Sequence, residues 1–308
     1  VQFKRMPMGS IDLDSCLSIV ENGYIKNNGE EAGEFVSYYG DYWVYQSNPE
    51  VQCGQIKVQS GSHKIVLDNL MLDEYQNRGS ASQIYVKSGC KVDFYLNGES
   101  ILKNSGNYAC INVENGAEVT FWDYEDGVIS VTAVDGAAIG GNASGNMGNI
   151  GIVSGKISAK SENGAAIGAG KAGESLGCIT ISGGAITAAS IYGAAIGGGA
   201  EAASDCEIRV EDGSIIATSQ YGAGLGSGCG CDNRGNICIS GGKLLANENR
   251  TLGSGGLGGY SIYNQGNATS GSKGADSFGG IGAGGNIGGD GGSRSYSIGG
   301  SGETGKPG

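Results

Sequence analysis

The stretch GAAIG, residues 136–140, occurs again at residues 164–168 and 193–197, and the variant GAGLG occupies residues 222–226. The copies follow one another at intervals of 28 or 29 residues. Small residues that recur at a fixed interval indicate a structural repeat, because each copy must match the geometry of the copy before it. We therefore predict a repeat protein.

Five further columns of residues keep this interval through four repeats. Two columns are rich in isoleucine, one is glycine, one is aliphatic and one is alanine. The isoleucine columns are Ile150, Ile179, Ile208 and Ile237, and Ile152, Ile181, Val210 and Ile239. The other three are Gly155, Gly184, Gly213 and Gly242, then Ile157, Ile186, Ile215 and Leu244, and then Ala159, Ala188, Ala217 and Ala246. Within a repeat, apolar residues alternate with polar or variable ones, which is typical of a strand with one buried face. The glycines between strands can turn a corner at positive φ.

A unit of short strands and corners cannot bury its inner face alone. Stacking successive units about 4.8 Å apart pairs every strand with a neighbour on each side. The sequence therefore predicts an all-β fold, a parallel β-helix (solenoid) with coils of 28 or 29 residues. We expect it to be right-handed, because left-handed forms use shorter rungs of about six residues.

The repeat continues toward the N-terminus in degraded form. Ile111 lies 28 residues before Ile139, Ile84 lies 27 before Ile111, and Ile56 lies 28 before Ile84. These coils also hold larger residues, such as Phe94, so we expect the cross-section to widen toward the N-terminus.

The chain is predicted to have three regions. An N-terminal cap rich in aromatic residues would occupy residues 1–50, the β-helix residues 51–250 and a glycine-rich segment residues 251–308. The cap would cover the unpaired strand edges at the end of the solenoid. We expect the glycine-rich segment to be ordered and to pack on the helix or on a neighbouring subunit, with apolar residues such as Ile281 as anchors.

Several longer runs accompany the repeat. They are IVLDNLML at 65–72, QIYVKSGCKVDFYLNGESIL at 83–102, CINVENGAEVTFW at 110–122 and ISGGAITA at 181–188. Together with the GAAIG copies, they resemble the β-helical, carbohydrate-binding-domain-type repeats of large bacterial surface proteins and adhesins. The resemblance covers about residues 51–250. It implies a β-helical module of a cell-surface protein.

The composition limits the partners and the compartment. The chain has 62 glycines among 308 residues and a net charge of -12, which argues against nucleic acid or an anionic membrane as a partner. No apolar run is long enough to span a bilayer. The start at Val1, without a methionine or a signal-like segment, indicates a mature or trimmed chain.

Nine cysteines favour a secreted protein with some disulfides. Cys178 and Cys206 fall on adjacent coils, one residue out of register, so a disulfide between them is a candidate. Cys229, Cys231 and Cys238 cluster in the following coil and are candidates as well, with connectivity left open. With one histidine, His63, in the chain, we expect no metal site and no cofactor.

Aromatic residues concentrate in FVSYYGDYWVYQ, residues 35–46. Tyr38, Tyr39, Tyr42 and Trp43 could form a stacking platform for sugar rings. The competing interpretation is a plug for the end of the solenoid core. Both interpretations remain open at this point.

An enzyme would need carboxylates that converge on one groove. The best local candidates are Asp123 and Asp126 in WDYEDG, with Glu99 about one coil earlier. The competing interpretation is a charged outer turn, which is common in an acidic chain. No acidic residue recurs down a column of the regular repeats, so catalysis is the less favoured reading.

The sequence thus favours a secreted or cell-surface structural protein without a catalytic centre, a rigid scaffold for adhesion or for assembly into a filament or array. Its partners would be other copies of itself, or a surface glycan or host ligand. A carbohydrate-binding module that uses the N-terminal aromatic residues is the first alternative. A polysaccharide lyase or glycoside hydrolase is the second.

Overall fold

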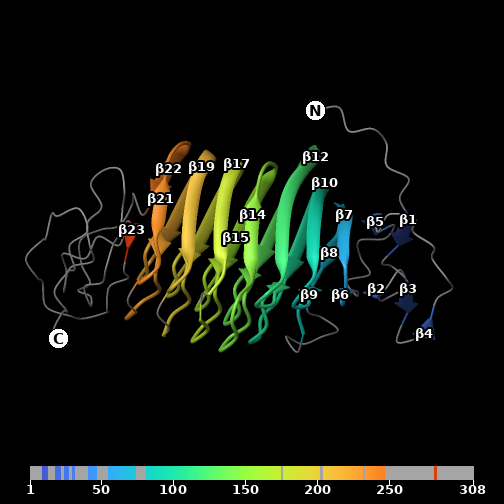
Figure 1. Ribbon diagram of the computed structural model, residues 1–308, viewed down its shortest axis with the longest axis horizontal. Coiled ribbons are helices and arrows are strands. Elements are labelled where there is room, and N and C mark those ends of the chain that lie inside the picture. The colour runs from blue at the N-terminus through green and yellow to red at the C-terminus, as the bar shows by residue number, and fades with distance from the viewer. Residues whose placement is uncertain are drawn as a thin grey trace, which may run out of the picture.

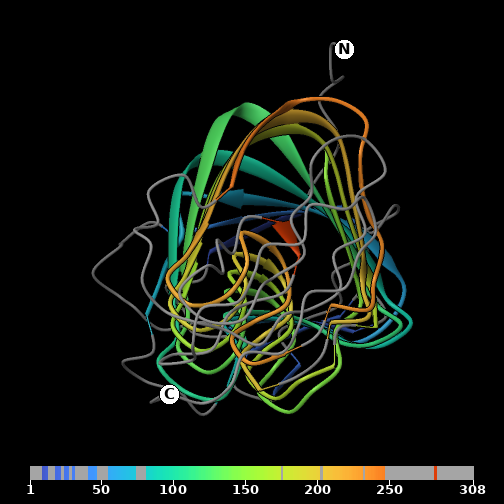
Figure 2. The same ribbon diagram turned by 90° about the vertical axis from the view of Figure 1, so that its left-hand side faces the viewer.

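Parallel strands from successive coils stack side by side along one axis in the computed structural model (Figure 1). The structure describes residues 9–12, 18–21, 24–27, 30–31, 41–46, 55–73, 81–174, 176–201, 204–231, 233–246 and 281–282. All regular elements in these ranges are strands, and viewed along the axis the coils superpose (Figure 2). The predicted all-β parallel β-helix is confirmed.

The strands form two sheets. The first, the long-strand sheet, contains β1 (Gly9–Asp12), β5 (Asp41–Tyr45), β7 (Ser62–Asp68), β8 (Met71–Leu72), β10 (Lys91–Lys103), β12 (Glu118–Thr132), β14 (Asn149–Ile152), β15 (Lys156–Ser161), β17 (Cys178–Ser190), β19 (Glu207–Ser219), β21 (Ile237–Ile239) and β22 (Lys243–Ala246). The second, the short-strand sheet, contains β2 (Ser18–Glu21), β3 (Tyr24–Asn27), β4 (Glu30–Glu31), β6 (Ile56–Val58), β9 (Ile84–Val86), β11 (Ile111–Val113), β13 (Ile139–Gly140), β16 (Ile167–Gly168), β18 (Ile196–Gly197), β20 (Leu225–Gly226) and β23 (Ile281–Gly282). Strand β3 pairs antiparallel with β2 and β4, whereas the coils themselves pair in parallel.

The columns predicted from the sequence are the registers of the stacked strands. Ile150 pairs with Ile179 and Ile179 with Ile208, and the second isoleucine column, the aliphatic column and the alanine column pair in the same way. The glycine column, Gly155, Gly184, Gly213 and Gly242, has φ values of 94°, 87°, 107° and 81°. These glycines therefore turn the corners as expected, in a backbone region that disfavours side chains.

The core changes in size along the axis. Phe94 stacks on Phe121 in the N-terminal coils, with ring centroids 5.6 Å apart, and both are fully buried. The same inward column continues with Ile152 and Ile181 in the later coils. The interior therefore holds larger side chains toward the N-terminus.

The GAAIG copies form the narrow part of the short-strand sheet. Ile139, Ile167, Ile196 and Leu225 pair in sequence and are fully buried, as are the alanines before them. A Cβ on Gly168 would collide with the backbone carbonyl of Gly197 in the next coil. The motif is therefore required by the close approach of neighbouring coils.

Both ends of the stack carry further rungs. Strand β5 pairs in parallel with β7, and β2 pairs with β6, so strands from residues 18–45 continue both sheets. At the other end, Ile281 pairs with Leu225, which extends the GAAIG ladder with a strand from the glycine-rich segment. The rest of residues 251–308 lies outside the described residues, and the predicted region boundaries stay predictions.

Candidate functional site

One outward column of the short-strand sheet carries large polar side chains. Lys57 pairs in register with Tyr85, Tyr85 with Asn112, and Asn112 with Gly140. The flanking residues of each strand, such as Ile84 and Val86, are buried because successive side chains of a strand alternate between faces. From Gly140 onward this column is glycine, so the polar side chains are confined to the earlier coils.

Two adjoining pockets lie over this column, and we call them together the amide groove. The first, of about 330 Å³, is lined by Gln55, Lys57, Gln59, Ala81, Ser82, Tyr85, Lys87, Tyr108, Asn112 and Asn142. The second, of about 350 Å³, is lined by Asn112, Glu114, Asn115, Asn142, Ser144, Gly145 and Asn146. Because both pockets share Asn112 and Asn142, the groove crosses several coils along the helix axis.

Two buried polar groups in the groove lack partners. Asn112 is 2% exposed and Ser82 is 3% exposed. Neither Asn112 Nδ2 nor Ser82 Oγ has a hydrogen-bond partner among the residues that the structure describes. A buried polar group left unpaired costs about 1–3 kcal/mol, so such groups point to a ligand or an ordered water.

The remaining polar groups of the groove are held in place by neighbouring coils. Tyr85 Oη donates to Glu114 Oε1 at 2.6 Å, and the backbone N–H of Ser88 donates to Glu114 Oε2 at 3.0 Å. Burial, followed by the hydrogen bond to Glu114 and its charge, raises the pKa of Tyr85 well above its ordinary value. The backbone N–H of Ala109 donates to Asn142 Oδ1 at 2.8 Å. The lining of the groove is therefore preorganised.

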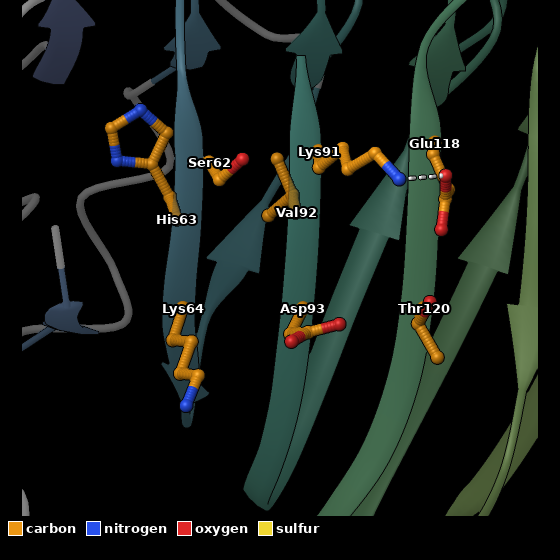
Figure 3. A pocket seen from close by; sticks show the side chains of 8 residues that line it. All are labelled: Ser62, His63, Lys64, Lys91, Val92, Asp93, Glu118 and Thr120. Atoms are coloured by element: carbon orange, nitrogen blue, oxygen red, sulfur yellow. Dashed lines mark ion pairs between the residues drawn. The ribbon is translucent and has the colours of Figure 1, made fainter.

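A third pocket, of about 380 Å³, lies on the outer face of the long-strand sheet, and we call it the sheet pocket (Figure 3). Two rows of side chains cross β7, β10 and β12 there: Ser62, Lys91 and Glu118 in one row, and Lys64, Asp93 and Thr120 in the other. Lys91 Nζ lies 2.7 Å from Glu118 Oε2, and the hydrogen bond with Glu118 raises the pKa of Lys91. Two lysines and two carboxylates balance in this pocket, whereas the amide groove has an excess of positive charge at one end.

His63 borders the sheet pocket. His63 is 9% exposed, Nε2 lies 2.6 Å from the carbonyl oxygen of Ser60, and Nδ1 is buried without a partner within the described ranges. The ring lies on the opposite side of β7 from Lys91 (Figure 3) and packs 5.9 Å from the ring of Tyr42. The histidine therefore closes the core rather than facing Asp93 and Glu118.

The candidate catalytic carboxylates lie on the outer turns of β10 and β12. Glu99 is exposed, and the side chain of Asp126 is 97% exposed with its carboxylate 3.7 Å from Lys156 Nζ. Asp123 Oδ1 accepts a hydrogen bond from the backbone N–H of Gly127 at 2.8 Å, which holds the turn. None of the three lines the pockets described above.

The candidate sugar platform is divided between two faces of β5. Tyr42 is fully buried in the core, whereas Trp43 is half-buried on the outer face. Trp43 Nε1 donates to Asp68 Oδ2 at 2.8 Å, and its ring meets the ring of Tyr124 edge-on at 5.2 Å. Tyr38 and Tyr39 lie outside the described residues. Alternation along the strand therefore separates Tyr42 from Trp43.

The candidate disulfide between Cys178 and Cys206 is not formed, because both residues carry free thiols. Cys178 pairs in register with Glu207 and is half-buried, whereas Cys206 is fully buried. An offset of one residue turns two side chains to opposite faces of a sheet. Cys238 also carries a free thiol, and Cys231 Sγ donates to the carbonyl oxygen of Cys229 at 3.4 Å.

The amide groove was not predicted from the sequence. Tyr85 and Asn112 stand between pairs of inward isoleucine and valine residues, which was a usable signal that both point outward. The contribution of residues 142–146 had no such signal, because they lie in a turn that the register of the strands does not place.

Comparison with known protein families, curated proteins and solved structures finds no match. Among the described residues, no helix is long and apolar enough to cross a membrane. Within the same residues, no group of three or more His, Cys, Asp or Glu side chains is arranged to hold a metal ion.

Proposed function

We propose that this protein is a non-catalytic, extracellular or cell-surface β-helix, a rigid scaffold that presents a ligand-binding face for adhesion. The observation that carries the proposal is the stack of in-register parallel coils. The coils between the two ends of the stack are paired on both sides and filled by a continuous apolar core, which gives a stiff support for side chains on the outer face. The resemblance of residues 51–250 to repeats of bacterial adhesins supports the same role.

Carbohydrate binding is the second candidate function, and the amide groove favours it over the N-terminal aromatic residues. Amide side chains and an exposed tyrosine surround buried polar groups that lack partners. A polysaccharide-degrading activity has less support, because Asp123 holds a turn and Asp126 is solvated. Assembly into a filament or array would add self-association to the adhesive role.

The location can be tested on intact cells of the producing organism. Antibodies against the purified protein are expected to label unpermeabilised cells or the culture supernatant, and external protease is expected to remove the cell-bound signal. A cytoplasmic protein processed alongside serves as the control for lysis. Labelling that requires permeabilisation would contradict the proposal. Release of new reducing ends from a polysaccharide by the purified protein would contradict its non-catalytic part.

A further inference from the structure

The amide groove has an unsatisfied hydrogen-bond donor at its centre. Asn112 Nδ2 is buried without a partner in the described part of the chain, and Asn112 lines both pockets of the groove. Ser82 Oγ, likewise buried without a partner, lies in the first pocket. A ligand that carries several oxygen atoms would satisfy both groups, because an amide donates and a hydroxyl both donates and accepts.

The first pocket is positively charged in an otherwise acidic protein. Lys57 and Lys87 line it, and neither ammonium group forms an ion pair with a described carboxylate. Glu114 lines the second pocket of the amide groove, and its two carboxylate oxygens already accept hydrogen bonds from Tyr85 and Ser88. Two lysines that have no ion-pair partner among the described residues, in a chain of net charge -12, favour an anionic ligand at this end of the groove.

An exposed aromatic ring borders the same pocket. Tyr108 lines it and is 40% exposed, which is high for a large apolar side chain in this protein. The flat face of a tyrosine ring packs well against the apolar face of a ring-shaped ligand, while polar groups around it bind the ligand's edge. This combination fits a sugar ring.

The length and walls of the groove favour an oligosaccharide over a peptide. The groove follows β6, β9, β11 and the turn after β13, which are three coil spacings of about 4.8 Å, or about 14 Å in all. The strands beneath it are paired on both sides, so an extended peptide finds no free strand edge to join. The walls are amides and lysines, which match the hydroxyl and carboxylate groups of acidic sugars.

We propose that the amide groove binds an oligosaccharide of carboxylated sugars, laid along the helix axis. Lys57 and Lys87 bind a sugar carboxylate, Tyr108 packs on a ring, and Asn112 donates to a ligand oxygen at the centre. This inference rests on the proposed adhesive function and names the class of ligand.

The test measures binding of a hexamer of galacturonic acid to the full chain by isothermal titration calorimetry. The same hexamer in its methyl-esterified form keeps the rings and loses the carboxylates. We expect the acid form to bind at least tenfold more tightly than the ester, and its affinity to fall as sodium chloride is raised. A sialylated trisaccharide tested alongside distinguishes uronic from sialic acids. Binding of neither acidic sugar would overturn the proposal.

Variants locate the binding to the groove. Lys57→Gln with Lys87→Gln should weaken binding of the hexamer about tenfold, and Tyr108→Ala about fivefold, because these side chains are on the surface and their loss leaves the core intact. The matched control is Lys243→Gln, an exposed lysine of β22 on the other sheet, which should bind as the unmodified chain does. Equal affinity of the groove variants and the control would overturn the proposal.

Asn112→Asp tests the centre of the groove, because it replaces a donor by a carboxylate of the same shape. Binding should fall by more than tenfold, with folding checked by circular dichroism. If this variant does not fold, the surface variants still decide the matter. Failure of the inference is distinct from failure of the proposed function. If the protein is displayed on cells but does not bind acidic sugars, the inference alone is wrong. If it binds acidic sugars but lies inside the cell, the proposed function alone is wrong.

Discussion

Buried hydroxyl groups fix the corners of this β-helix residue by residue. Ser161, Ser190 and Ser219 each donate to the carbonyl of the first glycine of a GAAIG copy one coil earlier, at 2.9, 2.8 and 2.6 Å. Each serine lies three residues before its own GAAIG or GAGLG copy. The serine therefore joins two coils at the point where the chain enters the narrow part of the short-strand sheet. Asn112 shows the opposite case, because its buried Nδ2 has no hydrogen-bond partner on the described neighbouring coils.

The buried thiol of Cys206 makes the free energy of unfolding depend on pH. Burial raises its pKa to about 11, so the thiol stays protonated in the folded chain while the unfolded chain ionises from about pH 9 upward. Its contribution to stability is therefore complete below about pH 9 and is lost as the pH rises to about 11, on the order of 2 kcal/mol in all.

Urea unfolding at several pH values checks this expectation. The unmodified chain should lose more free energy of unfolding between pH 9 and 11 than Cys206→Ala does. All other ionisable groups are the same in both chains, so their effects cancel in the difference. Parallel curves for the two chains would show that the pKa of Cys206 is ordinary.

At the scale of the element, the GAAIG strands are set by backbone contact between coils. Gly140, Gly168, Gly197 and Gly226 all have positive φ, and at the first three of these positions a Cβ would meet the carbonyl of the following coil. Two separate constraints therefore act on the same residue: the backbone conformation and the lack of space. This explains why the final glycine of the motif is kept even in the GAGLG variant.

Two glycine substitutions separate these constraints. Gly168→Ala adds a collision with the carbonyl of Gly197 to an unfavourable φ of 142°. Gly89→Ala has an unfavourable φ of 84° but no atom within 4 Å of its Cβ, so it should cost about 1–2 kcal/mol. We expect Gly168→Ala to cost at least about 2 kcal/mol more than Gly89→Ala, measured by urea unfolding. Equal costs would mean that the coils separate freely at the GAAIG ladder.

The register of the long strands was predictable from the sequence, but the contacts between side chains on their outer faces were not. The alternation of Ile179, Thr180 and Ile181 predicted which side chains point inward, because the period of a strand is two residues. The contact of Trp43 with Tyr124 follows from the path of the turn that joins the two halves of β12, which brings residues from distant coils together. A turn of this kind leaves no periodic trace in the sequence.

At the scale of the whole molecule, each coil is stabilised mainly by the coils on either side of it. Stability in such a stack depends on pairs of neighbours, so a coil near the end has less support than a central coil. The last coil of the long-strand sheet shows this directly. Leu244 in β22 is only partly buried, whereas its partner Ile215 in β19 is 1% exposed.

Hydrogen exchange followed by mass spectrometry tests this gradient. Peptides from β12 and β17 should exchange slowest, and peptides from β21 and β22 should exchange faster, because a terminal coil opens without disrupting the rest. Exchange at one uniform rate across these strands would indicate that the stack opens as a single unit.

The sequence by itself determined the coil length, the inward columns and the corner glycines. These features repeat because each coil must match the last, and a requirement that recurs at a fixed interval is visible in one chain. The tertiary structure alone decided what lies on the outer surface. In it, Cys178 and Cys206 lie on opposite faces, and Tyr42 lies in the core whereas Trp43 lies on the outer face. Lys57, Tyr108 and Asn112 line one groove. The physical reason is that the core of a β-helix is periodic, whereas a site on its surface is built where turns of different coils meet and no period applies.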